Sequence, residues 1–272
     1  KPSLWQAFAQ PAARTMFLFG FASGLPFLLV AGTLAYWLRE GGLELKQITM
    51  IASAGLAYSL KFLWAPLLDR LRLPLLGRLG LRRSWLLLAM GTVIAGLVGM
   101  SLIGPDALAP FVWLTLAVAF AGATLDIAVD AYRVEIAAPE HQGALVATYS
   151  LGYRIALIVT GAVALVLADH ISWQWVYRIM AAAMALPLLM VLFAREPDVR
   201  RVQTHGWAEG LREGVVAPFA DFFARFGWGT AALLLLFILS MKISDQALVG
   251  GIIGGVLVCR MYKLDAWTIA DL

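Results

Sequence analysis

The chain has 272 residues, of which 61% are hydrophobic and 14% are charged, and its formal net charge is +4. Soluble domains carry roughly 25% charged residues, so this composition excludes an ordinary soluble fold. The positive charge does not indicate a nucleic-acid partner, because the basic residues cluster between apolar runs. The single cysteine, Cys259, excludes an intrachain disulfide.

Several apolar stretches are long enough to cross a bilayer, for which a helix needs about 20 residues. In chain order, the predicted spans are Thr15–Leu38, Ile48–Leu68, Ser84–Ile103, Pro110–Asp130, Leu145–Ala168, Trp173–Ala194 and Thr230–Cys259. We therefore predict an all-α, multi-pass protein embedded in a lipid bilayer.

A charged segment separates the last of these spans from the others. We interpret residues 1–194 as a six-helix bundle, 195–229 as a linker and 230–272 as the first helix of a second, truncated half. Spans one and seven are interrupted by small residues or proline, at Gly20, Gly24, Pro26, Gly250, Gly251, Gly254 and Gly255. Paired interrupted spans are typical of transporters built from repeats. The same glycines also permit close helix packing.

The positions of lysine and arginine predict the orientation. With a cytoplasmic N-terminus, the outside loops hold only Arg39 and Lys46. The inside segments then hold Lys1, Arg14, Arg70, Arg72, Arg78, Arg82, Arg83, Arg133, Arg195, Arg200, Arg201, Arg212 and Arg225. The bias predicts that the N-terminus and the linker are cytoplasmic.

Ionisable side chains inside spans are costly and usually face a cavity. Asp126, Asp130 and Arg133 are spaced four and three residues apart, so they share one helical face. Two carboxylates one turn apart resist being ionised together, so one of them is expected to bind a proton readily. Asp126 and Asp130 are therefore candidates for proton coupling. In the alternative, both acids form fixed ion pairs with Arg133 or Arg154.

Other charges within spans suit an anionic substrate. Arg154 offers a planar fork for carboxylate or phosphate, and Lys61 offers a point charge. The remaining candidates for substrate binding are Tyr58, Tyr149, Tyr153, Lys242 and Asp245. In the alternative, Arg154 neutralises Asp126 and the tyrosines are core aromatics.

Neither enzymatic chemistry nor a cofactor is expected. The histidines show no metal-ligand spacing, and no nucleophile–base motif or phosphate-binding loop occurs. A seven-span receptor, suggested by the helix count alone, would place the N-terminus outside if built like familiar receptors. The charge bias argues against that orientation.

Two loops resemble signatures of the major facilitator superfamily. One is Ala65-Pro-Leu-Leu-Asp69-Arg70 followed by Arg82-Arg83, with Ala65 in place of the usual glycine; the other runs from Glu135 to Gly143. The resemblance implies two six-helix halves, of which about five spans lie outside this chain. It also implies a cytoplasmic gate formed by Asp69, Arg70, Arg82, Arg83, Arg133 and Glu135.

A more specific resemblance is to the AmpG-type muropeptide permeases. It is carried by Leu60-Lys-Phe-Leu-Trp-Ala-Pro-Leu-Leu-Asp-Arg70, Asp126-Ile-Ala-Val-Asp-Ala-Tyr-Arg-Val-Glu135, Leu151-Gly-Tyr-Arg-Ile155 and Ala168-Asp-His170. This family implies proton-driven import of anhydromuropeptides, which are peptidoglycan fragments, across the bacterial inner membrane. The related acetyl-coenzyme A transporters share parts of these motifs, so another anionic metabolite remains the alternative substrate.

Overall fold

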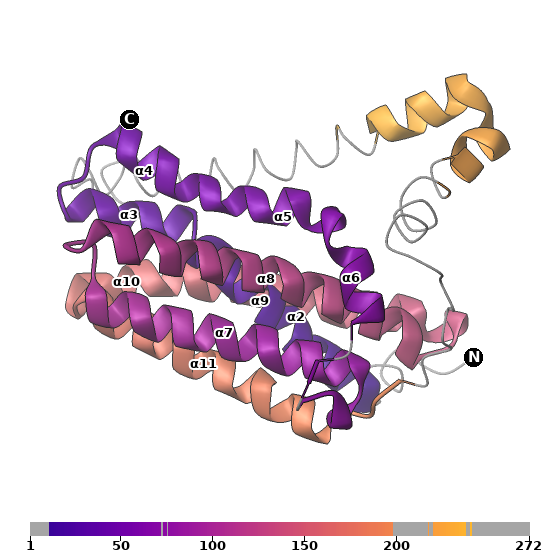
Figure 1. The fold of residues 1–272 in the computed structure, drawn as a ribbon, viewed down its shortest axis with the longest axis horizontal. Coiled ribbons are helices and arrows are strands. Elements are labelled where there is room, and N and C mark those ends of the chain that lie inside the picture. The colour runs from indigo at the N-terminus through magenta and orange to yellow at the C-terminus, as the bar shows by residue number, and fades with distance from the viewer. Residues whose placement is uncertain are drawn as a thin grey trace, which may run out of the picture. The chain divides into compact units, whose positions relative to one another are not determined.

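The structure, a computed structural model, describes residues 11–71, 73–74, 76–197, 217, 220–237 and 240. The chain divides into two compact units, Lys1–Val202 and Gln203–Leu272. Every regular element in the described residues is a helix, and no strand occurs among them, which confirms the all-α prediction. The labelled helices of Figure 1 all belong to the first unit.

The first predicted span, Thr15–Leu38, consists of two helices, α2 (Pro11–Leu29) and α3 (Gly32–Glu40). Between them the backbone of Ala31 leaves the helical region, with φ −128° and ψ −89°. Pro26 lies inside α2 and has no N–H to donate, which weakens the helix ahead of this break. The interruption expected in span one is therefore a break between two helices.

Two hydrogen bonds tie this break to later helices. The Tyr177 hydroxyl donates to the carbonyl of Leu29 at 2.8 Å, and the Thr33 hydroxyl donates to the carbonyl of Thr160 at 2.6 Å. Thr160 lies in a π-helical turn, η5 (Val159–Val163). Hydrocarbon offers no hydrogen bonds, so carbonyls at irregular positions in a span need protein partners such as these.

The predicted span Ile48–Leu68 is an interrupted helical segment rather than one regular helix. The segment is made of α4 (Leu45–Ala52), η1 (Ser53–Gly55), α5 (Leu56–Leu60), η2 (Lys61–Leu63) and α6 (Ala65–Arg70). The Ser53 hydroxyl donates to the carbonyl of Met50 at 2.6 Å, a bond that competes with the helical ladder. Pro66 cannot donate a backbone hydrogen bond, so the helix starts afresh at α6.

The other spans of this unit have the predicted type and differ at their ends. They are α7 (Leu81–Ile103), α8 (Leu108–Ile136), α9 (Gln142–Ile158), continued by η5 and α10 (Ala164–His170), and α11 (Trp173–Phe193). The largest difference is in α8, which continues past the predicted end at Asp130 to Ile136. Apolar length predicts the end of a span where charged residues begin, but the α-helix itself continues through these charged residues.

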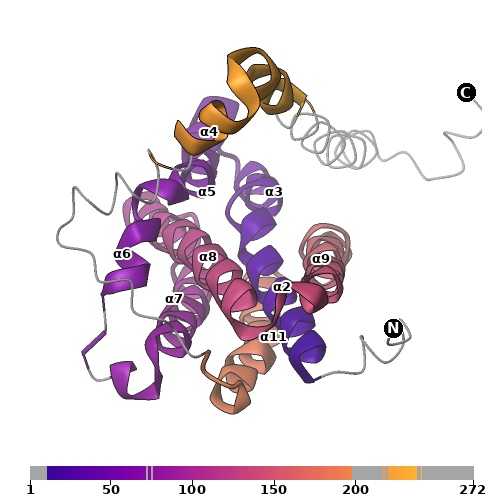
Figure 2. The ribbon, with the colours of Figure 1, turned by 90° about the vertical axis from the view of Figure 1, so that its right-hand side faces the viewer.

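Helix α2 packs against α9 with their backbones in contact (Figures 1 and 2). A Cβ atom on Gly24 would lie 2.7 Å from the carbonyl oxygen of Tyr153. At Gly20 and Gly152 the carbonyl oxygen of the facing helix is closer still. Gly20 and Gly24 therefore serve close packing, which is one of the two roles that the sequence left open for them.

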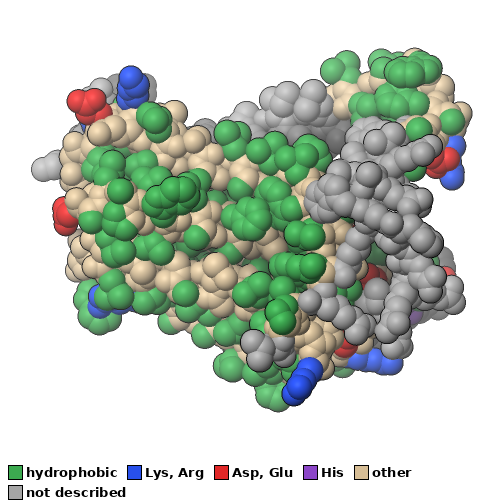
Figure 3. Space-filling model, viewed as in Figure 1, with side chains coloured by type: hydrophobic (Ala, Val, Ile, Leu, Met, Phe, Trp, Pro, Cys, Tyr) green, Lys and Arg blue, Asp and Glu red, His purple; other side chains and the backbone are tan. Residues whose placement is uncertain are grey.

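The surface of the first unit is that of a membrane protein. Figure 3 shows hydrophobic side chains over its flank and charged side chains towards its edges. The described helices long and apolar enough to cross a membrane are Pro11–Glu40, Leu81–Ile103, Leu108–Ile136, Pro139–His170, Trp173–Phe193 and Ala220–Phe237. The protein is therefore a multi-pass membrane protein.

The second unit contains the described helix Ala220–Phe237. This helix begins before Thr230, inside the range 195–229 that we interpreted as linker. The predicted site residues Lys242 and Asp245 lie outside the described residues.

Candidate functional site

The ammonium group of Lys61 lies between two carboxylates of α8. Its Nζ atom is 3.2 Å from Asp126 Oδ2 and 4.0 Å from Asp130 Oδ2. Asp130 is also 3.3 Å from the guanidinium of Arg133. The spacing argument placed the three α8 residues on one face, and their contacts agree. The cation facing Asp126 is Lys61, and not Arg154, which the alternative interpretation of the sequence had paired with it. We call Lys61, Asp126, Asp130 and Arg133 the central cluster.

Local packing fixes the irregular turn that carries Lys61. The indole Nε1 of Trp64 donates a 3.1 Å hydrogen bond to the hydroxyl of Thr124 on α8. The same indole stacks on Phe120, with ring centroids 4.6 Å apart. Because η2 ends just before Trp64, this anchor holds Lys61 against the acidic face of α8.

The two carboxylates have different surroundings. The Asp126 side chain is 11% exposed, and its Oδ1 atom is buried without a hydrogen-bond partner among the described residues. The Asp130 side chain is 45% exposed and has two cations nearby. The hydroxyls of Ser23 and Tyr58 are likewise buried without a hydrogen bond of good geometry in the described part of the chain, and the Ser23 hydroxyl lies close to Asp126 and Tyr149. Buried polar groups of this kind normally bind a partner, so this region can receive a proton or a small polar group.

The predicted substrate residues of α9 fall into two settings. Tyr149 and Tyr153 are within electrostatic range of Asp126, and their ring centroids are 6.2 Å apart. Arg154, in contrast, is exposed and has no ion pair or hydrogen bond to any other described residue. A free guanidinium within a span is costly unless water, a ligand or another part of the protein meets it.

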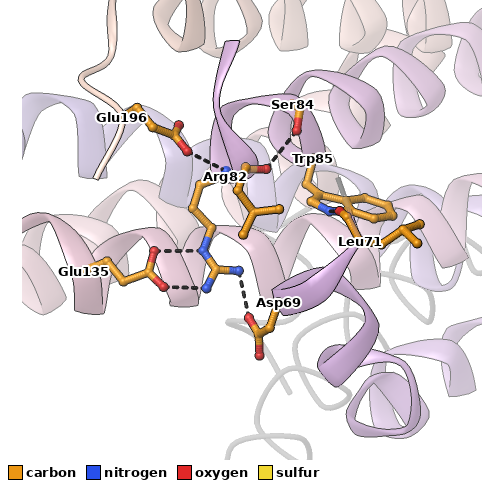
Figure 4. Close-up of polar contacts among 8 residues, drawn as sticks. Asp69, Leu71, Arg82, Ser84, Trp85, Glu135 and Glu196 are labelled. Carbon is orange, nitrogen blue, oxygen red and sulfur yellow. Dashed lines mark hydrogen bonds and ion pairs between the residues drawn. The ribbon is translucent and has the colours of Figure 1, made fainter. Parts of the chain in front are cut away.

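A second polar group, the Arg82 cluster, lies where α6, α7 and α8 meet. Arg82 Nη1 donates to Asp69 at 2.8 Å, and Nε donates to Glu135 at 2.8 Å. Its Nη2 atom donates to the other oxygen of Glu135. Figure 4 shows the guanidinium between these two acids. The Arg82 side chain is only 5% exposed, so the ion pairs hold three helices together.

One groove borders both clusters. It has a volume of about 510 Å³ and lies between α6 and α8. Its lining includes Lys61, Asp69, Arg82, Asp130 and Glu135. Charged side chains of the two clusters therefore border the same groove.

The comparison with known families decides what this bundle is. Residues 15–259 match the family model of the Major Facilitator Superfamily. The chain belongs to this superfamily. The match covers both clusters and the break in span one, and it confirms the resemblance drawn from the loops around Asp69 and Glu135.

Among curated proteins, the chain is similar to the anhydromuropeptide permease of Escherichia coli K12, at 38% identity over 88% of this chain and 47% of that protein. It is also similar to putative transporter AmpG 4 of Rickettsia felis, at 36% identity over 86% of this chain and 56% of that protein. The resemblance to AmpG-type proteins is thereby confirmed. The chain spans about half the length of the curated relatives it matches.

The structure distributes the expected gate residues over several contacts. Asp69, Arg82 and Glu135 come together, whereas Arg133 contacts Asp130 in the central cluster. Arg83 lies next to the Arg82 cluster but donates to backbone carbonyls instead of the acids. The Arg70 side chain lies outside the described residues.

Sequence reasoning missed Glu196, whose carboxylate accepts hydrogen bonds from the first turn of α7. An available signal was Gly80, since a glycine before a helix supplies no side-chain cap. Among the described residues, no cluster of three or more His, Cys, Asp or Glu side chains has the geometry to hold a metal ion.

Proposed function

We propose that this chain forms part of a secondary transporter that imports anhydromuropeptides across the bacterial inner membrane by proton-coupled alternating access. Membership of the Major Facilitator Superfamily and the names permease and transporter among its relatives support transport rather than catalysis. The excess of lysine and arginine on one side of the spans supports a cytoplasmic N-terminus.

The observation that carries the proton-coupling proposal is the state of Asp126. One of its oxygens pairs with Lys61 at 3.2 Å, and the other is buried without a partner among the described residues. A proton that binds Asp126 neutralises the carboxylate and weakens its hold on Lys61. The ammonium group can then turn to Asp130, which is already 4.0 Å away. Proton binding thus changes which acid of α8 forms the ion pair with Lys61.

We assign substrate recognition to side chains of α9. The guanidinium of Arg154 is exposed and has no partner in the described part of the chain, and it suits a carboxylate of the peptide part of a muropeptide. Tyr149 and Tyr153, near Asp126, suit the sugar part, because aromatic rings stack on sugar rings and their hydroxyls form hydrogen bonds. Lys242 and Asp245 are proposed to contribute from span seven.

The Arg82 cluster is proposed to be the cytoplasmic gate. Its ion pairs join α6 to α7 and α8, and the Asp69 side chain is 56% exposed. The more exposed Asp69 contact is the one that breaks when the inner side opens, because water can replace it at low cost. The bond between Arg82 and Glu135 then stays intact.

Transport by the complete protein in proteoliposomes tests this function. An inward proton gradient should drive accumulation of radiolabelled anhydromuropeptide, and Asp126→Asn should abolish accumulation while exchange of internal for external substrate continues. Asp106→Asn, at an exposed acid between α7 and α8, is the matched control and should behave as wild type. Gradient-independent uptake by the wild type, or normal accumulation by Asp126→Asn, contradicts the proton assignment. Uptake of acetyl-coenzyme A in place of the muropeptide contradicts the substrate assignment.

A further inference from the structure

The N-terminal end of α7 has an unusual cap. Its N-cap residue is Gly80, which has no side chain to accept hydrogen bonds from the first turn. The carboxylate of Glu196, which follows α11, takes that place. Glu196 Oε1 accepts from the backbone N–H of Arg82 at 2.9 Å, and Oε2 accepts from that of Arg83 at 3.1 Å. These are the two N–H groups that an ordinary N-cap side chain satisfies.

The geometry of Gly80 makes room for this carboxylate. Its φ of +113° lies in a region that favours glycine, so another residue would be strained there. A Cβ atom at this position would also collide with the carboxylate of Glu196. The absence of a local cap and the presence of a distant one are therefore two aspects of the same arrangement.

The capping is reciprocal. The guanidinium of Arg83 donates to the carbonyl of Val191 at 2.9 Å and to that of Leu192 at 2.7 Å, at the C-terminal end of α11. Each helix thus places a side chain of favourable charge on the terminus of the other: an acid at the N-terminus of α7 and a guanidinium at the C-terminus of α11. A further bond, from the Tyr132 hydroxyl to the carbonyl of Arg195 at 2.8 Å, ties α8 to the same segment.

We propose that Glu196 is the positioning residue of the gate. It holds the backbone N–H of Arg82, whose guanidinium must reach both Asp69 and Glu135 (Figure 4). Because Glu196 fixes the first turn of α7, the Arg82 side chain is already placed to form its ion pairs with Asp69 and Glu135. Displacement of the segment after α11 frees this turn and loosens the contact with Asp69. The consequence for transport rests on the proposed gate function, whereas the positioning itself is measurable without transport.

The test uses the complete protein in detergent, with Cys259 and every other native cysteine replaced by serine and a single new cysteine introduced. Ala65→Cys reports on the groove beside Asp69, and its rate of alkylation by a maleimide is the readout. Glu196→Gln should raise this rate roughly tenfold or more, the effect expected from losing one hydrogen bond to a charged group. Arg82→Gln should raise it at least as much, and the double variant should not exceed Arg82→Gln alone.

Two controls separate positioning from general loosening. Glu140→Gln makes the same chemical change at an exposed acid and should leave the rate unchanged. Ala89→Cys reports on a buried position farther along α7 and should label equally slowly with and without Glu196→Gln. Faster labelling at both cysteines, additive effects with Arg82→Gln, or no effect at Ala65→Cys each overturn the proposal. If the Glu196→Gln protein cannot be produced in folded form, Glu196→Asp is used instead. Its shorter side chain should raise the alkylation rate at Ala65→Cys, by less than the increase expected for Glu196→Gln.

Discussion

Lys61 and Asp126 form a 3.2 Å ion pair between the irregular second segment and α8. Breaking a buried pair by removing one partner costs about 3–5 kcal/mol, whereas removing both charges costs much less. The Lys61 side chain is 32% exposed, so water partly compensates, and we expect Lys61→Gln to lower the unfolding free energy by about 2 kcal/mol. Adding Asp126→Asn should restore most of this loss.

Titration with SDS in mixed micelles measures these unfolding free energies. Lys46→Gln is the control, because Lys46 is an exposed cation near the start of the same segment. A double variant less stable than Lys61→Gln alone would show that the ion pair does not govern this contact.

The backbone contact between α2 and α9 predicts a sharp size limit at Gly152. In Gly152→Ala the new methyl group meets the carbonyl of Phe17 and must push the helices apart, at a cost of about 1–3 kcal/mol. At Gly91 a Cβ atom would meet nothing within 4 Å, so Gly91→Ala should be neutral or stabilising by up to about 1 kcal/mol. Equal thermal unfolding temperatures for the two variants would contradict the close crossing.

The hydroxyl of Thr33 is predicted to stabilise the break in span one. Thr33→Val keeps the shape but removes the bond to the Thr160 carbonyl, which should cost about 1 kcal/mol or more because that carbonyl is buried. Thr115→Val is the matched control, since this buried hydroxyl bonds only to the Phe111 carbonyl one turn back in its own helix. Unfolding in detergent should rank Thr33→Val below Thr115→Val, and the reverse order would argue against the tie.

Arg82 is predicted not to tolerate lysine. Three guanidinium nitrogens donate to two acids on different helices, and a single ammonium group cannot reproduce this geometry. We expect Arg82→Lys to reduce substrate accumulation roughly tenfold, in line with the loss of a charge-assisted hydrogen bond. Arg83→Lys should be milder, because backbone carbonyls also accept from ammonium. Uptake measurements in proteoliposomes compare the two, and equal losses would remove the distinction.

Arg154 is predicted to bind the anionic group of the substrate through its planar fork. Arg154→Ala should weaken binding of the muropeptide roughly tenfold or more, and Arg154→Lys should recover only part of the affinity. Arg14→Ala removes an exposed arginine near the end of a span and should not alter binding. Equilibrium binding to the purified protein provides the measurement, and identical affinities for the alanine and lysine variants would exclude a bidentate contact.

The sequence predicted what depends on local periodicity. The predicted span Trp173–Ala194 differs by one residue from α11. A long apolar run with polar residues at both ends determines where a helix begins and ends. The shared face of Asp126, Asp130 and Arg133 likewise follows from helix geometry alone.

Features that depend on contacts between distant segments were not predicted. Lys61 was considered a substrate anchor, and its pairing with Asp126 becomes evident only when α8 lies beside η2. The interruptions of Ile48–Leu68 were not predicted, because apolar length does not reveal a competing hydroxyl at Ser53 or the missing donor at Pro66. Glu196 has no sequence motif that links it to a helix begun more than a hundred residues earlier.

The cap that Glu196 provides also has a bearing on the order in which the protein is assembled. Glu196 is 114 residues further along the chain than Arg82, and chains emerge from the ribosome N-terminus first. When α7 enters the membrane, its first turn must therefore be served by water or lipid headgroups. Only after α11 has been synthesised and inserted can the carboxylate take over. The cap of α7 is thus completed only after α11 has been made. Ribosome-bound chains that end before Glu196 should therefore have an uncapped helix end at Gly80.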